Sequence, residues 1–333
     1  MRLLYSIALS IVTKAYAVHN NENNRPIKIQ LAHGYSIASW YNNYMSVRDY
    51  YLEHFDELPL EKQKHFATRI KYWFKDSRFD DFLAANEPSH DLAAVLANND
   101  YSGVNNLEAR RPFFEKYPEL YGLEACLFRI NRLLIEYDVD LREDFLKEYP
   151  RERLYKLCDD LLQDDQALAS LSTYAVNVIC LTENLFPRDN GIYETLTQRY
   201  LKAEQHTEFI YAYTHIILCM SNFYTKEVRG KDWDLAQQML AKCEQMIEDH
   251  FDEITIDTKL EFLVCCRINK EIFDYEPVYT YADINKECKE SLKDSPFVVD
   301  KRRPEKYNTL SGAEHRNVLY IMSGLDYWSS TRK

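Results

Sequence analysis

Glycine is scarce in this chain. Only seven of the 333 residues are glycine, well below the ordinary usage of about 7%. Dinucleotide-binding folds need glycine in their phosphate-binding turns, and β-rich folds need it in tight turns and bulges. The shortage therefore disfavours both classes and favours a mostly helical chain.

Recognisable catalytic and metal-binding motifs are also missing. The sequence contains no phosphate-binding loop, no dinucleotide fingerprint, no Gly-x-Ser-x-Gly, no His-Glu-x-x-His and no Cys-x-x-Cys. We therefore expect no metal site and no cofactor. The composition is that of an ordinary globular protein, which excludes collagen-like, disordered and multi-pass membrane proteins.

Positive charge is in the minority. Lys and Arg number 41 and Asp and Glu number 53, which gives a net charge of −12. An acidic chain repels phosphate backbones, so nucleic acid is not an expected partner. The 26 tyrosines are amphipathic side chains suited to helix layers and to interfaces. The expected partner is a protein or a small polar ligand.

The first 17 residues allow two interpretations. Arg2, an apolar run from Leu3 to Val12, and the small-x-small ending Ala15-Tyr16-Ala17 are the ordered elements of a signal peptide. The same residues also form an apolar stripe at helical spacing, as in a first amphipathic helix. The apolar run is too short to span a bilayer. The signal elements favour export, to the periplasm or outside the cell, over a cytoplasmic location.

The pattern of the cysteines argues against export. Eight cysteines fall mostly within apolar helical runs, where a free thiol behaves as a small hydrophobic group. That pattern suits a reducing compartment, although an even number permits disulfides in an exported protein. The location of the protein stays open on these grounds.

Helical periodicity dominates the rest of the chain. Leu235, Met239, Cys243 and Met246 form one of several apolar stripes. Prolines and glycines, such as Pro59, Pro112, Pro150 and Gly230, cut the chain into segments of one or two helices each. We predict an all-α fold of stacked helical hairpins, either an irregular solenoid or a toroid-like α/α ring. No long linker occurs, so residues 18–333 are expected to form one domain.

One apolar segment carries an ordered polar stripe. Between residues 208 and 224, Glu208, Tyr211, His215 and Asn222 fall within one helical sector. Polar groups on an apolar helix must face partners or a cavity, because unpaired burial costs about 1–3 kcal/mol for each group. His215, Tyr211 and Glu208 are therefore candidate catalytic residues.

Further polar residues recur on neighbouring predicted helices. Asn177 and Asn184 lie seven residues apart, Asp257 and Glu261 lie four apart, and His315 opens a late helix. If these faces converge, Glu261 joins the catalytic candidates, and Asn177, Asn184, Asn222, Asp257 and His315 are ligand-binding candidates. The alternative is an internal hydrogen-bond network that only stabilises the fold.

The region around His215 resembles a known motif. Tyr211, Thr214 and His215 are followed by Ser221-Asn222-Phe223. They resemble a Tyr-x-x-Thr-His motif, followed by Thr-Asp-Phe-Gly, in uncharacterised bacterial all-helical proteins that form a domain of unknown function. The similarity covers about the C-terminal two fifths of the chain. It implies helices and a functional His215, but no reaction, and Asn222 departs from the Asp of that pattern.

Two functions are compatible with this pattern. The first is a helical scaffold that binds a partner protein or ligand without chemistry. The second is a hydrolase or lyase that acts on a polar substrate, such as a carbohydrate, in a central helical funnel. In that case His215 is the acid/base, Tyr211 and Asn222 orient the substrate, and Glu208 or Glu261 supplies a carboxylate.

Overall fold

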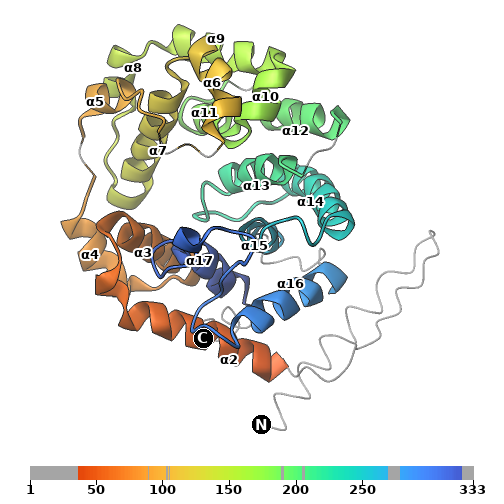
Figure 1. Cartoon of the computed structure of the whole chain (residues 1–333). Coiled ribbons are helices and arrows are strands. Elements are labelled where there is room, and N and C mark those ends of the chain that lie inside the picture. The colour runs from red at the N-terminus through yellow and green to blue at the C-terminus, as the bar shows by residue number, and fades with distance from the viewer. Residues whose placement is uncertain are drawn as a thin grey trace. The chain divides into compact units, whose positions relative to one another are not determined.

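The computed structural model describes residues 37–324, apart from 89, 103, 105, 189–190, 205–206 and 269–277. These residues form sixteen α-helices and three short 3-10 helices, and they contain no β-strand (Figure 1). The prediction of an all-α fold is confirmed. The α-helices are α2 (Ile37–Glu53), α3 (Leu60–Phe74), α4 (Asp80–Ala85), α5 (Leu92–Leu96), α6 (Leu107–Lys116), α7 (Leu120–Tyr137), α8 (Arg142–Glu148), α9 (Arg151–Gln163), α10 (Asp165–Leu171), α11 (Thr173–Leu185), α12 (Ile192–Lys202), α13 (Phe209–Met220), α14 (Lys231–Asp249), α15 (Ile256–Cys265), α16 (Val278–Ser291) and α17 (Glu314–Ser323).

Local sequence signals set many helix ends. Pro59 and Pro150 directly precede α3 and α9, where the fixed φ of proline suits a helix start. The Thr255 side chain accepts a hydrogen bond from the Thr258 amide at the start of α15. Gly230, with φ at 58°, directly precedes α14 in a conformation that other residues adopt only with strain.

Pro112 does not break the chain as we expected. It lies inside α6, where it removes one amide donor from the helix. It is exposed, and only Phe114 of this ten-residue helix is fully buried. The helix therefore continues through the proline.

Contacts between six helices connect distant parts of the sequence. Close contacts join α3 to α17, α17 to α15, α15 to α13, α13 to α11, and α11 to α7. Arg132 Nη2 of α7 also donates a hydrogen bond to Thr68 Oγ1 of α3, at 3.1 Å. The helices α12 and α14 pack on α13, and α16 packs on α15 (Figure 1).

The core is built from the apolar faces of these helices. On α3, Phe66, Ile70 and Trp73 are almost completely buried. All eight cysteines are buried as free thiols within the core. The described residues from Ala38 onward form one compact unit by their contacts. Residues 1–17 lie outside the described residues, so their two interpretations and the domain boundary at residue 18 stay predictions.

None of the described helices is long and apolar enough to cross a bilayer.

Candidate functional site

His215 lies on α13 with its two ring nitrogens in different surroundings. Its Nδ1 lies 2.8 Å from Asn177 Oδ1 of α11, and its Nε2 lies 3.6 Å from Glu261 Oε1 of α15. Because an amide oxygen only accepts, Nδ1 carries the proton in this contact. In the neutral ring, Nε2 then has a free lone pair that faces a carboxylate beyond hydrogen-bond distance.

Glu261 is held from two sides. Thr214 Oγ1 donates a hydrogen bond to Glu261 Oε1, and His315 Nε2 lies 3.8 Å from Glu261 Oε2. Only 3% of the Glu261 side chain is exposed. Burial by itself raises a carboxyl pKa, but contacts with His315 and His215 outweigh it and lower the pKa of Glu261. Glu261 is therefore a carboxylate at neutral pH.

The structure adds His65 and Glu314, which the sequence analysis did not select. His65 Nδ1 of α3 lies 2.7 Å from Glu314 Oε1 of α17, so this N–H donates to the carboxylate. His65 Nε2 then accepts from His315 Nδ1, at 3.3 Å. A polar histidine on the same helix as Phe66 and Ile70 was a signal, but nothing in the sequence places α3 beside α17.

Asn177 extends the network to α7. Its Nδ2 donates to Glu124 Oε1 at 2.8 Å while its Oδ1 accepts from His215. Burial raises the pKa of Glu124 to about 7, against the opposing effect of the Asn177 hydrogen bond. Glu124 therefore titrates near neutral pH.

Together these residues form one continuous polar belt. Each of the helices α3, α7, α11, α13, α15 and α17 contributes at least one member. In the list that follows, each residue lies close to the next one. The belt consists of Glu124, Asn177, His215, Glu261, His315, His65 and Glu314.

The three histidines of the belt reach solvent. The exposed fraction of the side chain is 20% for His215, 24% for His65 and 35% for His315. Burial, aided by the charge of Arg69, lowers the pKa of His65 to about 3 and also lowers that of His215. His65 and His215 are thus neutral at pH 7 and accessible, which is the state that a general base requires.

Tyr211 and Asn222 lie beside the belt in different ways. Burial and the charge of Glu261 raise the pKa of Tyr211 to about 12, so its hydroxyl stays protonated. The helix α13 ends at Met220, earlier than the segment we expected to be helical. Asn222 therefore lies beyond the helix, in the left-handed region with φ at 49°, and its Oδ1 accepts from Asn131 of α7 at 2.9 Å.

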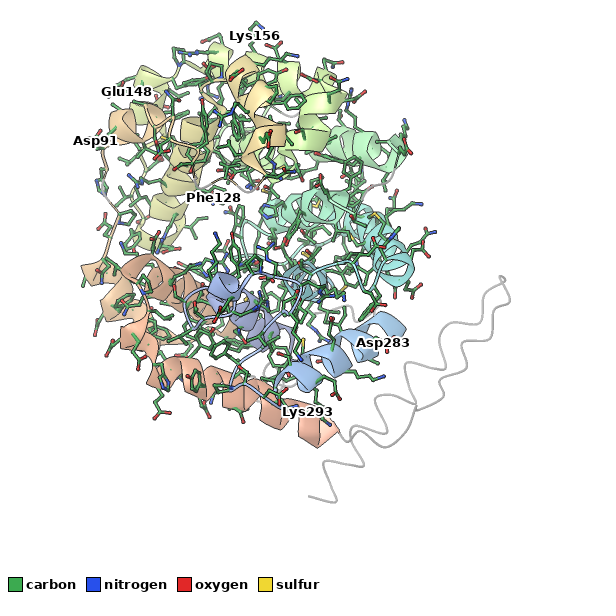
Figure 2. The ribbon with its side chains drawn as sticks, viewed as in Figure 1. Asp91, Phe128, Glu148, Lys156, Asp283 and Lys293 are labelled. Atoms are coloured by element: carbon green, nitrogen blue, oxygen red, sulfur yellow. The ribbon has the colours of Figure 1, made fainter. Side chains whose placement is uncertain are left out.

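The turn after α13 is strained. Asn222, Phe223 and Tyr224 all have positive φ, which costs residues other than glycine about 1–2 kcal/mol each. Phe223 packs on Phe128 of α7, which Figure 2 labels, with ring centroids 4.7 Å apart. Tyr224 packs edge-on against Trp73 of α3. These contacts compensate the strain and fix Asn222 against α7.

Three predicted site residues lie outside the belt. Glu208 is exposed at the N-cap of α13. Asn184 donates to the Cys219 carbonyl and accepts from the Tyr193 hydroxyl. Asp257 pairs with the buried Arg316 at 2.9 Å. Glu208 thus precedes the helix, and Asn184 and Asp257 belong to other hydrogen-bond networks.

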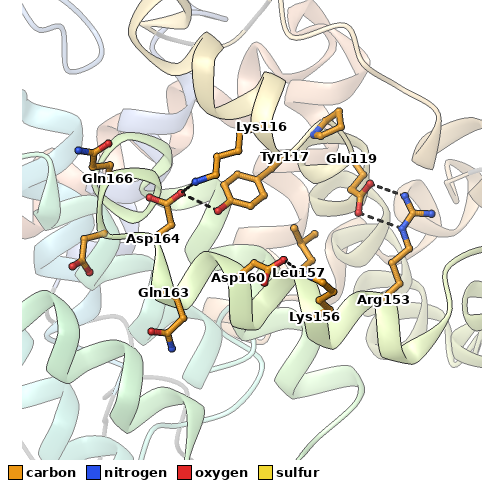
Figure 3. Close-up of a pocket in the computed structure, with 12 residues that line it drawn as sticks. Lys116, Tyr117, Glu119, Arg153, Lys156, Leu157, Asp160, Gln163, Asp164 and Gln166 are labelled. Atoms are coloured by element: carbon orange, nitrogen blue, oxygen red, sulfur yellow. Dashed lines mark hydrogen bonds and ion pairs between the residues drawn. The ribbon is translucent and has the colours of Figure 1, made fainter.

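A separate surface groove of about 990 Å³ lies between the end of α6 and the helices α9 and α10 (Figure 3). Its cations pair with carboxylates of the groove: Lys116 with Asp164, Arg153 with Glu119 and Lys156 with Asp160. The Tyr117 hydroxyl also donates to Asp164, and Asp165 pairs with Arg199 outside the groove. The sequence analysis did not predict this groove. It contains no histidine and none of the candidate site residues, so the belt is the stronger candidate for chemistry. The groove is lined by Lys116, Tyr117, Pro118, Glu119, Arg153, Lys156, Leu157, Asp160, Gln163, Asp164, Asp165 and Gln166.

Across the part of the chain that the structure describes, no three His, Cys, Asp or Glu side chains are grouped so as to hold a metal ion.

The family comparison covers the C-terminal part of the chain. Residues 183–333 match a family model described as Domain of unknown function (DUF3541). This segment contains His215, Glu261, Glu314 and His315, whereas His65, Glu124 and Asn177 precede it. Comparison with curated proteins and with solved structures gave no match. Residues 183–333 are thus similar to an uncharacterised domain.

Proposed function

We propose that the polar belt binds a small polar ligand and that His215 acts on it as a general base, in a hydrolase or lyase reaction. A polyhydroxylated compound such as a carbohydrate fits this site, because the bare His215 Nε2 and the Glu261 carboxylate both accept hydrogen bonds. The substrate must then supply the hydroxyl donors.

The arrangement of the helices supports a ring around this site. The contacts that run from α3 through α17, α15, α13 and α11 to α7 return to α3 through the Arg132–Thr68 hydrogen bond. An open solenoid does not bring its first and last helices together, as α3 and α17 are here. We therefore favour the α/α ring over the solenoid, with the belt on the side where the six helices meet.

One observation carries the proposal. His215 has its Nδ1 proton fixed by Asn177, its Nε2 lone pair unshared, and a fifth of its side chain exposed. In a purely structural network we expect both ring nitrogens to be hydrogen-bonded. The second nitrogen lies 3.6 Å from an acceptor, so this arrangement is completed by a donor from a ligand.

The scaffold interpretation finds less support. A scaffold that docks a partner protein is expected to expose an apolar or aromatic patch. Among the described residues, Leu60 is the exposed large hydrophobic side chain, at 49%. A single leucine is not a patch of the size that interfaces use.

Substrate turnover tests the proposal. A panel of glycosides, sugar acids and esters is assayed with the full chain and with the variants His215→Gln and Glu261→Gln. We expect kcat/KM of any active compound to fall about 10²–10⁴-fold in His215→Gln. His90→Gln is the matched control, because His90 is exposed and pairs with Glu87 outside the belt.

Binding provides the second measurement. Compounds from the same panel that raise the melting temperature of the full chain should do so less, or not at all, in both belt variants. Turnover or stabilisation that is equal in the full chain, in both belt variants and in His90→Gln would overturn the proposal. Circular dichroism verifies that each variant is folded.

A further inference from the structure

The amide of Asn177 lies between a carboxyl group and the ring of His215. Its Nδ2 lies 2.8 Å from Glu124 Oε1, and its Oδ1 lies 2.8 Å from His215 Nδ1. An ionised carboxylate only accepts hydrogen bonds, so an ionised Glu124 requires the amide NH2 on its side. The amide oxygen is then the atom that faces the ring. The charge of Glu124 therefore decides which atom of Asn177 His215 meets.

The other end of the His215 ring favours the opposite position of the ring proton. Its Nε2 lies 3.6 Å from Glu261 Oε1, and Glu261 is a carboxylate at neutral pH. A proton on Nε2 is attracted to that carboxylate, and hydrogen bonds to ionised acceptors are stronger than hydrogen bonds to neutral ones. The Asn177 oxygen is thus what keeps the proton on Nδ1, and it does so only while it faces the ring.

Glu124 lies half-buried on α7, on which α5 and α11 pack. The helix α5 carries only leucine, alanine and valine. From α11, Asn177 donates to Glu124, and the charge of Glu124 acts on Tyr174, whose hydroxyl is neutral because burial raises its pKa to about 12. Arg110 of α6 lies 5.7 Å from the centre of the Tyr174 ring and donates to the Ser170 carbonyl. In these surroundings burial raises the pKa of Glu124 to about 7, so both of its protonation states are populated near neutral pH.

A neutral Glu124 permits a second arrangement in which every donor has an acceptor. The amide of Asn177 turns over, its oxygen accepts from the new O–H of Glu124, and its NH2 donates to His215 Nδ1. One proton enters Glu124 from solvent. The ring keeps a single proton, which solvent exchange moves from Nδ1 to Nε2, since 20% of the His215 side chain is exposed. With an ionised Glu124 the turned amide would set two acceptor oxygens against each other, which is unfavourable.

We propose that Glu124 is a positioning residue for His215: in its ionised form it acts through Asn177 to hold the ring proton on Nδ1 and leave Nε2 bare, and in its neutral form it lets the proton occupy Nε2. The inference rests on the proposed function for the use of Nε2 as a base, whereas the position of the ring proton is a property of the chain without ligand. The base is then available where Glu124 is ionised. Glu124 and Asn177, which precede the matched family segment, thereby take part in the site.

Nuclear magnetic resonance of the full chain, labelled with nitrogen-15 in the histidine rings, tests the proposal. A ring nitrogen with a proton and one with a lone pair have well separated shifts, and the His215 signals are those missing from His215→Gln. At pH 8 we expect the proton on Nδ1. At pH 6.5 the ratio of the two tautomers should move about tenfold or more towards Nε2, while the lowered pKa of His215 keeps most rings neutral. Glu124→Gln, which carries no charge, should have the proton on Nε2 at both pH values.

A double variant separates this role from a merely structural one. Glu124→Gln combined with Asn177→Asp exchanges the positions of the amide and the carboxylate. The new carboxylate accepts from the new amide and from His215 Nδ1, so the ring proton should return to Nδ1 at pH 8. Glu115→Gln is the matched control, because it removes the same charge from an exposed position on α6. It should keep the tautomer and the pH dependence of the full chain.

Two results overturn this inference: a His215 tautomer that is the same in Glu124→Gln as in the full chain, or a double variant that leaves the proton on Nε2. The proposed function fails separately. Turnover that does not depend on His215 refutes the base role, and the nitrogen shifts still decide the position of the ring proton. Where turnover does depend on His215, kcat/KM should rise from pH 6.5 to pH 8 in the full chain and stay low in Glu124→Gln. Equal pH profiles in the two proteins would overturn the positioning role and keep the base.

Discussion

The partly buried histidine His65 makes the stability of the fold depend on pH. Its pKa is lowered to about 3, first by burial and then by the charge of Arg69. In the unfolded chain a histidine has a pKa of about 6.5, so the unfolded state binds more protons below that pH. The contribution of the neutral ring to stability is therefore fully present above pH 6.5 and is lost as the pH falls towards 3.

The two pKa values give the magnitude. At pH 8 both states carry a neutral ring, and the proton contributes almost nothing. At pH 5 the unfolded state gains about 2 kcal/mol from protonation of one histidine, while the folded state gains almost none. In His65→Gln this loss disappears. The full chain should therefore lose about 2 kcal/mol more than the variant between pH 8 and pH 5.

Urea unfolding measures this difference. It is followed by tryptophan fluorescence, which reports Trp73 on the same helix as His65. At the lower limit of pH 5, Glu261 and Glu314 stay ionised because their pKa values are lowered, and Glu124, with a pKa of about 7, is protonated in the full chain and in the variant alike. The exposed His90→Gln serves as the control and should keep the pH dependence of the full chain. An equal loss of stability in the full chain and in His65→Gln would refute the reasoning, because His65 would then titrate in the folded state as it does in the unfolded one.

Three other predictions concern packing and the thiols. Gly122→Ala should destabilise the fold by about 1–3 kcal/mol in thermal unfolding, because the new Cβ would lie 2.4 Å from the Leu96 carbonyl oxygen. This clash outweighs the higher helix propensity of alanine. An unchanged melting temperature would contradict the close packing of α5 on α7. Lys259→Met should change the free energy of unfolding by less than about 1.5 kcal/mol, since Glu287 loses Lys259 but keeps its pair with Arg302 at 2.7 Å. Lys259→Ala should lower the free energy of unfolding by about 2–5 kcal/mol, because it leaves a cavity. Equal effects of the two substitutions would mean that the charge of Lys259, and not its volume, matters. Burial raises the pKa of Cys126 and of Cys158 to about 12, and all eight cysteines are buried free thiols, so intact mass should show no alkylation of the native chain at pH 8 and eight added groups after denaturation; fewer than eight would indicate disulfides and would favour export.

The sequence analysis selected part of the polar belt. His215, Glu261, Asn177 and His315 were selected from polar spacing on apolar helices, and all four are in the belt. Glu208 obeyed the same spacing but lies at the exposed start of α13. Periodicity gives the direction of a side chain around its helix axis. It does not tell whether another helix packs against that position.

Other differences come from long-range contacts. Helical spacing extended the polar stripe to Asn222, but α13 ends before it and the chain turns through three left-handed residues. Local preference opposes that turn, and contacts with Phe128, Asn131 and Trp73 on other helices compensate it. A break expected at Pro112 did not occur.

The amino-acid sequence by itself determined the all-α class, the breaks at Pro59 and Pro150, and the apolar faces that build the core. These features depend on residues within a few positions of one another, so spacing and capping residues reveal them. Only the tertiary structure decided that α3 packs beside α17 and that His65, Glu314 and Arg69 join His215. His65 and Arg69 lie 150 and 146 positions before His215, and Glu314 lies 99 positions after it. The packing of six helices, which no local pattern encodes, brings them together.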